Sequence, residues 1–338
     1  MTDLQPTYSL VSAAINSTPP AAVADGDQWR MLFALLQRNH VAALCAEAAR
    51  AAGTPRAVLM PWLAEKEKAM LWQQHQREVQ DEIVGTMARH GIETLVLKGL
   101  HTAQYYPQPT LREFADLDLY FYSRHDEADR VAQNELKATI GNDGHHHSKY
   151  DYRGVTVESH YDFVNTHYPP SNRSYEVLLK RLAPSATFEV LFLLRHMAVH
   201  FASSHITLRD LCDWVLTCRA LAGQTDWNTV GQTAVEYGMG DFAAAIEDIA
   251  ARQLGGQRLT GLEPAPRLAD RMEQDIVMGC TASPGHEGDG ISRLGWKLRR
   301  WRANGWKRRA ALGDPPCRLA IASLASHAAK PRSIMHKV

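Results

Sequence analysis

Apolar side chains recur at helical spacing over residues 28–90, with one interruption by glycine and proline at 53–55. After that interruption the period continues unbroken, which predicts a long helix over 61–90 that ends at a histidine–glycine pair. Residues 1–25 instead are small, polar and punctuated by proline, which is typical of poorly ordered segments. We therefore expect a poorly ordered lead-in at 1–25 and an N-terminal helical region at 26–90.

Over residues 91–168 the pattern changes to the two-residue alternation of β-strands. The predicted elements are strands over 94–97, 116–122, 146–152 and 155–163, with a helix over 126–140. The last two strands are separated by Arg153-Gly154 and are typical of a hairpin. Short strands between long helices indicate a fold of the α/β (α+β) class, with a small mixed sheet at 91–168.

Helical periodicity returns after the proline pair at 169–170. The predicted helices cover 185–203, 207–222, 227–237, 240–254 and 268–278. A glycine-rich run at 283–290 then marks a loop. We expect a helical domain at 169–282 and a basic C-terminal segment at 283–338, so that helices flank the sheet core on both sides of the sequence.

Composition and charge indicate the class of protein but not the reaction that it performs. Lysine plus arginine and aspartate plus glutamate both number 37, so the net charge does not indicate a polyanionic partner. The five cysteines are scattered without zinc-knuckle spacing, which favours free thiols in a reducing compartment. The first ten residues do not resemble a secretory signal, and no apolar run reaches the roughly 20 residues of a membrane-spanning helix. We expect a cytoplasmic protein.

The second predicted strand contains two acids, Asp116 and Asp118, separated by one leucine. Successive strand residues point to opposite faces, so the two carboxylates share one face and the leucines take the other. Neighbouring carboxylates repel each other, and a divalent cation between them removes that penalty. A solvated strand face is the alternative, but the apolar residues around the pair indicate a half-buried strand. The spacing therefore favours a metal site for phosphoryl or nucleotidyl transfer.

Two other segments are candidates for the same site. Lys98-Gly99 lies where the first strand passes into a helix, a place where a backbone can approach a phosphate and lysine adds charge. An exposed lysine beside a turn glycine is the alternative. Arg112, four residues before the acidic strand, is suited either to bidentate phosphate binding or to an ion pair that fixes Asp116.

The last predicted strand presents Glu158 and His160 on one face. Glu158 can supply a third carboxylate, as a metal ligand or as the base that accepts a proton from an acceptor hydroxyl. The alternative is an edge-strand acid paired with Lys149 or Arg153. His160, one pleat further along, is suited to support Glu158 by a hydrogen bond.

Together these residues resemble a known family. The resemblance is carried by Lys98-Gly99, Arg112, Asp116-Leu-Asp118-Leu, Glu158-Ser-His160, His196, His200 and Leu208-Arg209-Asp210-Leu-Cys-Asp213. They resemble the uncharacterised nucleotidyltransferase family of the polymerase-β-like superfamily, over about 27–255. The wider superfamily has Gly-Ser at the nucleotide-binding turn, whereas Lys98-Gly99 is usual in this family.

The resemblance implies transfer of a nucleoside monophosphate from an NTP to a hydroxyl of an acceptor, with release of pyrophosphate. It implies that Asp116, Asp118 and Glu158 are catalytic and bind Mg²⁺ or Mn²⁺. The nucleotide would be bound by Lys98, Gly99, Arg112 and His160. The acceptor (a small molecule, a protein or an RNA) and the base of the NTP are not indicated, and a catalytically inactive nucleotide-binding or interaction protein of the same fold is the alternative.

Two histidine groups invite a zinc interpretation. In His145-His146-His147, strand alternation puts only the first and third on one face, and no cysteine or further carboxylate is spaced to help, so the sequence argues against zinc there. His196 and His200 have ligand spacing on a helix but lack the glutamate of the HExxH motif. We expect them to pack the helical domain or to line an acceptor cleft.

Near the C-terminus, Arg293–Arg309 contains three tryptophans among lysines and arginines and no acid. Nucleic acid or an anionic surface is one partner for such a segment. Because the rest of the chain is not basic, the pattern slightly favours a terminal amphipathic helix whose tryptophans pack on the protein.

Overall fold

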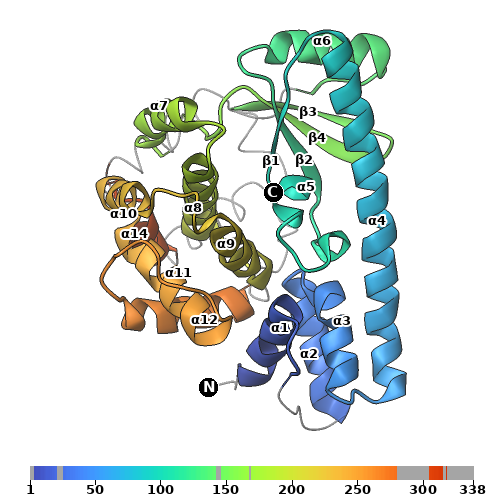
Figure 1. The fold of residues 1–338 in the computed structure, drawn as a ribbon, viewed down its shortest axis with the longest axis vertical. Helices are drawn as coiled ribbons and strands as arrows, with labels where there is room; N and C mark the ends of the chain where they lie inside the picture. The colour runs from blue at the N-terminus through green and yellow to red at the C-terminus, as the bar shows by residue number, and fades with distance from the viewer. Residues whose placement is uncertain are drawn as a thin grey trace, which may run out of the picture. The chain divides into compact units, whose positions relative to one another are not determined.

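The computed structural model describes residues 4–20, 26–141, 146–166, 169–279, 304–314 and 317. It confirms an α/β fold with a small mixed sheet among helices (Figure 1). The chain forms two compact units. The first consists of Met1–Asp162, Thr207–Gly223 and Ile249–Gln257, and the second of Phe163–Ile206, Gln224–Asp248 and Arg258–Val338.

The first unit begins with four helices: α1 (Gln5–Asn16), α2 (Gly26–Arg38), α3 (Ala42–Ala51) and α4 (Arg56–Arg89). Helix α1 contradicts the expected disorder of residues 1–25. Tyr8, Leu10, Val11 and Ile15 are at most 2% exposed, because α1 packs against α3. The polar composition of the whole segment concealed this apolar face. Helix α4 begins five residues before the predicted start and includes Pro61.

Four strands form one sheet in the order β1-β2-β4-β3. They are β1 (Leu95–Leu97), β2 (Asp116–Tyr120), β3 (His147–Tyr152) and β4 (Val155–His160). Strands β2 and β4 run parallel, and the other two pairs are antiparallel. Strand β2 is two residues shorter than predicted, because Tyr122 and Ser123 have φ angles of 45° and 70°, outside the extended region.

One face of the sheet is apolar and covered. Leu117 and Leu119 of β2 and Val155 and Val157 of β4 pack with Val79, Ile83 and Met87 of α4 and Ala128, Val131 and Ala132 of α6 (His125–Glu135). Figure 1 shows α4 running beside the sheet. Since side chains alternate along a strand, burial of these residues turns the intervening polar residues of β2 and β4 to the opposite face.

The segment between β1 and β2 contains α5 (Gly99–Ala103) and a 3₁₀ turn (Pro109–Leu111). Two buried amides of α4 hold this segment: Gln73 donates to the carbonyl of Pro109, and Gln76 donates to the carbonyl of Phe114 over 3.1 Å. Because Phe114 is only two residues before β2, α4 also fixes where the acidic strand begins.

Helix α9 (Leu208–Leu221) also belongs to the first unit. Its N-terminus is closed by a capping box in which Thr207 and Asp210 bond reciprocally. One turn later, Asp213 accepts hydrogen bonds from Arg112 Nε and Nη2, both over 2.7 Å, and from the hydroxyl of Tyr106 over 2.6 Å. Arg112 and Asp213 are 4% and 2% exposed, so this is a buried, bidentate ion pair.

The second unit is helical. Its elements are α7 (Asn172–Leu182), α8 (Ala186–Ser203), α10 (Trp227–Glu236), α11 (Gly240–Gln253, whose last residues join the first unit), α12 (Pro266–Met278) and α14 (Gly305–Ala311). Of the segment Arg293–Arg309, residues 293–303 lie outside the described residues. The described part packs: Trp306 contacts Phe201 edge to face, and Lys307 bonds to Asp275 over 2.5 Å.

Among the residues that the structure describes, no helix combines the length and the apolar character needed to cross a membrane. Cys45, Cys212 and Cys317 are free thiols, as predicted; Cys280 lies outside the described residues.

The Arg112–Asp213 pair yields a stability prediction. Arg112→Met should lower the free energy of unfolding by about 3–5 kcal/mol, because Asp213 would keep a buried charge without its partner. Combining Arg112→Met with Asp213→Leu should recover much of that loss. Urea unfolding of the full chain measures both.

The control is Arg153→Met, which breaks an exposed ion pair with Glu82 and should cost less than about 1 kcal/mol. Equal losses for Arg112→Met and Arg153→Met would contradict the role of the buried pair.

Candidate functional site

The parallel register of β2 and β4 builds a polar face on the sheet. It pairs Asp118 with Glu158 and Tyr120 with His160. The antiparallel register of β3 and β4 adds Lys149 opposite Glu158 and His147 opposite His160. Paired residues on neighbouring strands lie on the same face. The sheet therefore brings the acids of β2 together with Glu158 and His160, as the alternation in the sequence predicted.

Asp118 is the most enclosed acid of this face, with 3% of its surface exposed. His160 Nε2 lies 2.9 Å from its Oδ1, and Lys98 Nζ lies 3.2 Å from its Oδ2. Burial alone would raise the pKa of Asp118, but Lys98 and the hydrogen bond from His160 hold this pKa well below its usual range. Asp118 is therefore ionised, with a cationic or hydrogen-bonding partner at each oxygen.

Asp116 has a different environment on the same strand. It is half-buried and forms no ion pair with any residue that the structure describes. Burial raises its pKa, and the charges of Asp118 and Glu158 raise it further. Its ionised form is therefore unfavourable, and an added cation would stabilise it.

The surroundings of Glu158 fit both interpretations that the sequence left open, an ion-paired acid at the edge of the sheet and a third carboxylate of the site. Its carboxylate forms an ion pair with Lys149 over 3.3 Å, yet it also lies within reach of Asp118 and His160. Despite burial, which alone would raise it, the pKa of Glu158 is lowered to about 2, mainly by His160, whose Nε2 lies 3.7 Å away. The oxygen ligands of Asp118 and Glu158 and a nitrogen of His160 all lie within 4.8 Å of one another.

His160 itself bonds differently from the prediction. We expected it to support Glu158, but its Nε2 is closer to Asp118, at 2.9 Å, than to Glu158, at 3.7 Å. Its ring is 4% exposed, and the two carboxylates raise its pKa to about 9 against the effect of burial. The parallel register pairs His160 with Tyr120, two residues after Asp118, so His160 lies diagonally across from Asp118 on the same face.

The Lys98-Gly99 turn holds its lysine over this face. Both residues have left-handed φ angles, 46° and 49°. For Lys98 that conformation is strained, and strain of this kind persists where the surroundings enforce it, often at functional sites. The salt bridge from Lys98 to Asp118 shows where the side chain is directed: into the polar face rather than into solvent.

Arg112 has neither of the two roles that the sequence suggested. It neither pairs with Asp116 nor points a free guanidinium at a phosphate, because each guanidinium nitrogen donates to Asp213 or to the carbonyl of Gly99. The bond to Gly99, at 3.1 Å, makes Arg112 a support of the Lys98-Gly99 turn. Sequence spacing could not reveal this, since Asp213 is 101 residues away.

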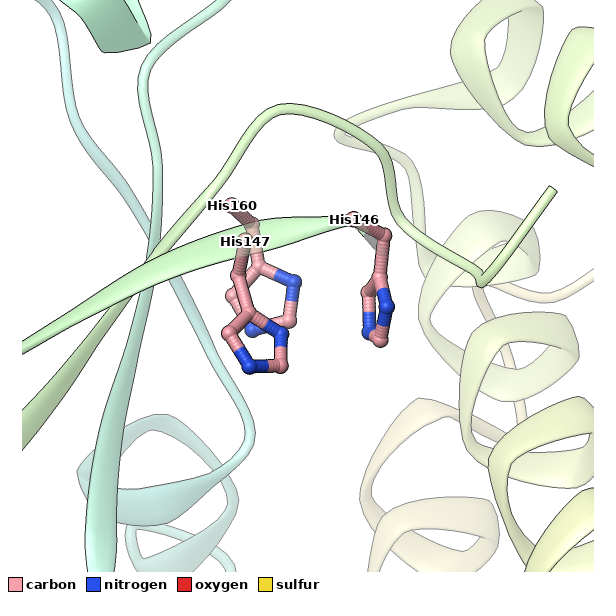
Figure 2. Close-up of side chains that lie close together, drawn as sticks. All are labelled: His146, His147 and His160. Carbon is pink, nitrogen blue, oxygen red and sulfur yellow. The ribbon is translucent and has the colours of Figure 1, made fainter. Parts of the chain in front are cut away.

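The structure also adds two residues that the sequence argument had set aside. His146 and His147 lie beside His160, and Figure 2 shows the three rings gathered together. The strand argument failed for His146 because β3 begins only at His147. The third histidine comes from β4, which no local spacing indicates. His145 lies outside the described residues, and His196 and His200 belong to α8 of the second unit.

Comparison with known proteins agrees with this geometry. A family model described as "Uncharacterised nucleotidyltransferase" matches residues 25–255. The chain belongs to this family. No curated protein and no solved structure matches the chain. The matched region of this nucleotidyltransferase family member includes the whole sheet, the Lys98-Gly99 turn and helix α9.

Loss of the negative charge should have opposite effects on thermal stability at the two acids of β2. In EDTA, Asp116→Asn should keep or raise the melting temperature, because it removes a carboxylate that burial and its neighbours disfavour. Asp118→Asn should destabilise the protein by about 1.5–3 kcal/mol, because it weakens charge-assisted hydrogen bonds at a buried position.

Thermal unfolding of the wild type and both variants, with EDTA present, measures this difference. A matched control is Asp81→Asn, which changes an exposed acid of α4. A marked drop in melting temperature for Asp116→Asn would show that Asp116 is a structural residue.

Proposed function

We propose that this protein is a Mg²⁺-dependent nucleotidyltransferase that moves a nucleoside monophosphate from an NTP to a hydroxyl of an acceptor. The observation that carries the proposal is the convergence of Asp116, Asp118 and Glu158 on the polar face of the sheet, beside Lys98. Family membership supports the general class of reaction. The fold alone would not, since one fold can host many activities.

The donor set suits a hard divalent cation. Mg²⁺ and Mn²⁺ prefer carboxylate oxygens and are commonly held by one or two carboxylates together with substrate phosphates. Asp116 and Asp118 would hold the cation, with Glu158 as third ligand. The raised pKa of Asp116 supports this assignment, because burial and the charge of Asp118 outweigh the positive charges of Lys98 and Lys149 nearby. When bound, the ion neutralises charge on the phosphates and on the attacking and leaving oxygens.

The protein's own residues would orient the reaction. Lys98 Nζ, 3.2 Å from Asp118, places a positive charge where triphosphate oxygens would approach the acids. His160 holds the Asp118 carboxylate in one orientation from the side opposite to Lys98. Arg112 acts through the backbone of Gly99 and therefore positions Lys98 without contacting substrate.

Glu158 fits a ligand better than a general base. A general base works best when its pKa lies near the working pH. The pKa of Glu158 is instead lowered to about 2, chiefly through the nearby His160. A carboxylate that stays ionised throughout the physiological range is what a metal ligand requires.

A non-catalytic nucleotide-binding protein of the same fold is the second candidate. One observation favours it: both oxygens of Asp118 have partners within the protein, Lys98 and His160. In that case the site would bind nucleotide through Lys98 but would not turn it over.

Consumption of NTP separates the two candidates. The purified full chain, with Mg²⁺, each α-labelled NTP in turn and a cell extract, should transfer label to one class of acceptor and release pyrophosphate. The double variant Asp116→Asn with Asp118→Asn should abolish transfer, whereas Asp81→Asn should not change it. Mg²⁺-dependent nucleotide binding without any transfer would favour the non-catalytic protein.

Glu158→Gln tests the role of the third carboxylate. If Glu158 is a ligand, Mg²⁺-dependent nucleotide affinity and turnover should fall together, and turnover should fall by roughly 10²-fold or more. Calorimetric titration of nucleotide with Mg²⁺, beside initial rates, measures both quantities. A fall of about 10²–10⁴ in turnover at unchanged affinity would make Glu158 the general base instead.

A further inference from the structure

Three imidazoles form a compact triangle at the end of the polar face. The ring centroids of His146 and His147 are 4.6 Å apart, those of His146 and His160 are 5.2 Å apart, and those of His147 and His160 are 5.1 Å apart. One ring nitrogen from each residue lies within 4.8 Å of the others. In Figure 2 the rings extend in the same direction from the start of β3 and the end of β4.

This triangle has the size of a three-histidine metal site. Zinc–nitrogen bonds are about 2.0–2.1 Å long, and a tetrahedral arrangement of three imidazoles on one ion places their ring centroids about 5 Å apart. The three observed separations, 4.6–5.2 Å, match that value.

The nitrogens are also available for such a bond. His146 Nδ1 and His147 Nδ1 are buried, and neither has a hydrogen-bond partner among the described residues. Buried polar atoms without partners are costly and call for an explanation such as an ion.

His160 has the second contact that metal-binding histidines usually make. Its Nε2 hydrogen-bonds to the Asp118 carboxylate over 2.9 Å. In protein metal sites, the ring nitrogen that does not bind the ion commonly donates to a carboxylate, which fixes the orientation of the imidazole. The other ring nitrogen, Nδ1, lies 3.3 Å from the backbone carbonyl oxygen of Asp162, so an ion bound by His160 would replace one of these two contacts.

We propose that His146, His147 and His160 bind Zn²⁺ at a site next to the carboxylate site for Mg²⁺. The two sites differ in donor chemistry, since imidazole nitrogens suit zinc and carboxylate oxygens suit magnesium. Glu158 Oε2 lies 3.6 Å from His147 Nδ1 and 3.7 Å from His160 Nε2, so the carboxylate proposed as third ligand for Mg²⁺ borders the zinc site. This site does not depend on the proposed nucleotidyl transfer.

Metal binding by the full chain tests the proposal. The protein, stripped with chelator, is titrated with Zn²⁺ alone, and the bound metal is counted after dialysis; Co²⁺ serves as a spectroscopic probe of tetrahedral nitrogen ligation. We expect one Zn²⁺ per chain and visible absorption from bound Co²⁺. His146→Ala and His147→Ala should each weaken Zn²⁺ binding by at least about tenfold, since even loss of an outer-shell partner costs about 10–100-fold.

Two controls make the result specific. His75→Ala removes a histidine of α4 that hydrogen-bonds to the Arg153 carbonyl and has no place in the cluster, so Zn²⁺ affinity should stay unchanged. The double variant His196→Ala with His200→Ala tests the other histidine pair, whose rings are 4.2 Å apart on α8. Loss of Zn²⁺ in that variant, with retention in His146→Ala, would overturn the proposal.

Failure of this site and failure of the proposed function can be told apart. His146→Ala should keep Mg²⁺-dependent nucleotide binding while losing Zn²⁺. Absence of stoichiometric Zn²⁺ and Co²⁺ binding by the wild-type chain would refute the zinc site, whatever the outcome of the nucleotidyl-transfer assay. Thermal unfolding of each variant in EDTA checks that it is folded.

Discussion

The ionised carboxylate of Asp118 is the constraint on which the candidate site depends. It lies in a buried position on β2, where an uncompensated charge would be very unfavourable. Lys98 from the turn after β1 and His160 from the end of β4 stabilise it, one at each oxygen. Because both partners are needed to stabilise this charge, three segments of the chain meet at the same point of the sheet: β2, the turn after β1 and the end of β4.

Support for this arrangement comes from outside the polar face. The apolar side of β2 and β4 packs against α4 and α6. The acids, which alternate with these apolar residues, therefore point to the opposite face of the sheet. Arg112 couples the carbonyl of Gly99 to Asp213 of α9, so the strained turn that presents Lys98 is held by a buried ion pair. Stability and positioning thus rely on the same contacts: a change at Asp213 would reach Lys98 through two hydrogen-bonded residues.

The polar face contains two kinds of ionisable side chain, carboxylates and imidazoles, and their pKa values shift in different directions. In β2, burial and the neighbouring carboxylates raise the pKa of Asp116. At the end of β4 and the start of β3, imidazoles gather, and burial lowers the pKa values of His146 and His147. His160 lies between the two groups and bonds to Asp118. A hard cation and a borderline transition metal would accordingly choose different ends of one face.

The sequence by itself determined the elements and the acids of the site. Strand alternation placed Asp116 with Asp118, and Glu158 with His160, because a residue's face depends only on its own strand. It misjudged α1, where a buried apolar face is hidden in a polar segment. Only the tertiary structure decided the partners: His160 for Asp118, Asp213 for Arg112, and His160 as the third imidazole beside His146 and His147. These pairs depend on the register between strands and on the packing of distant helices, and neither leaves a signal in local spacing.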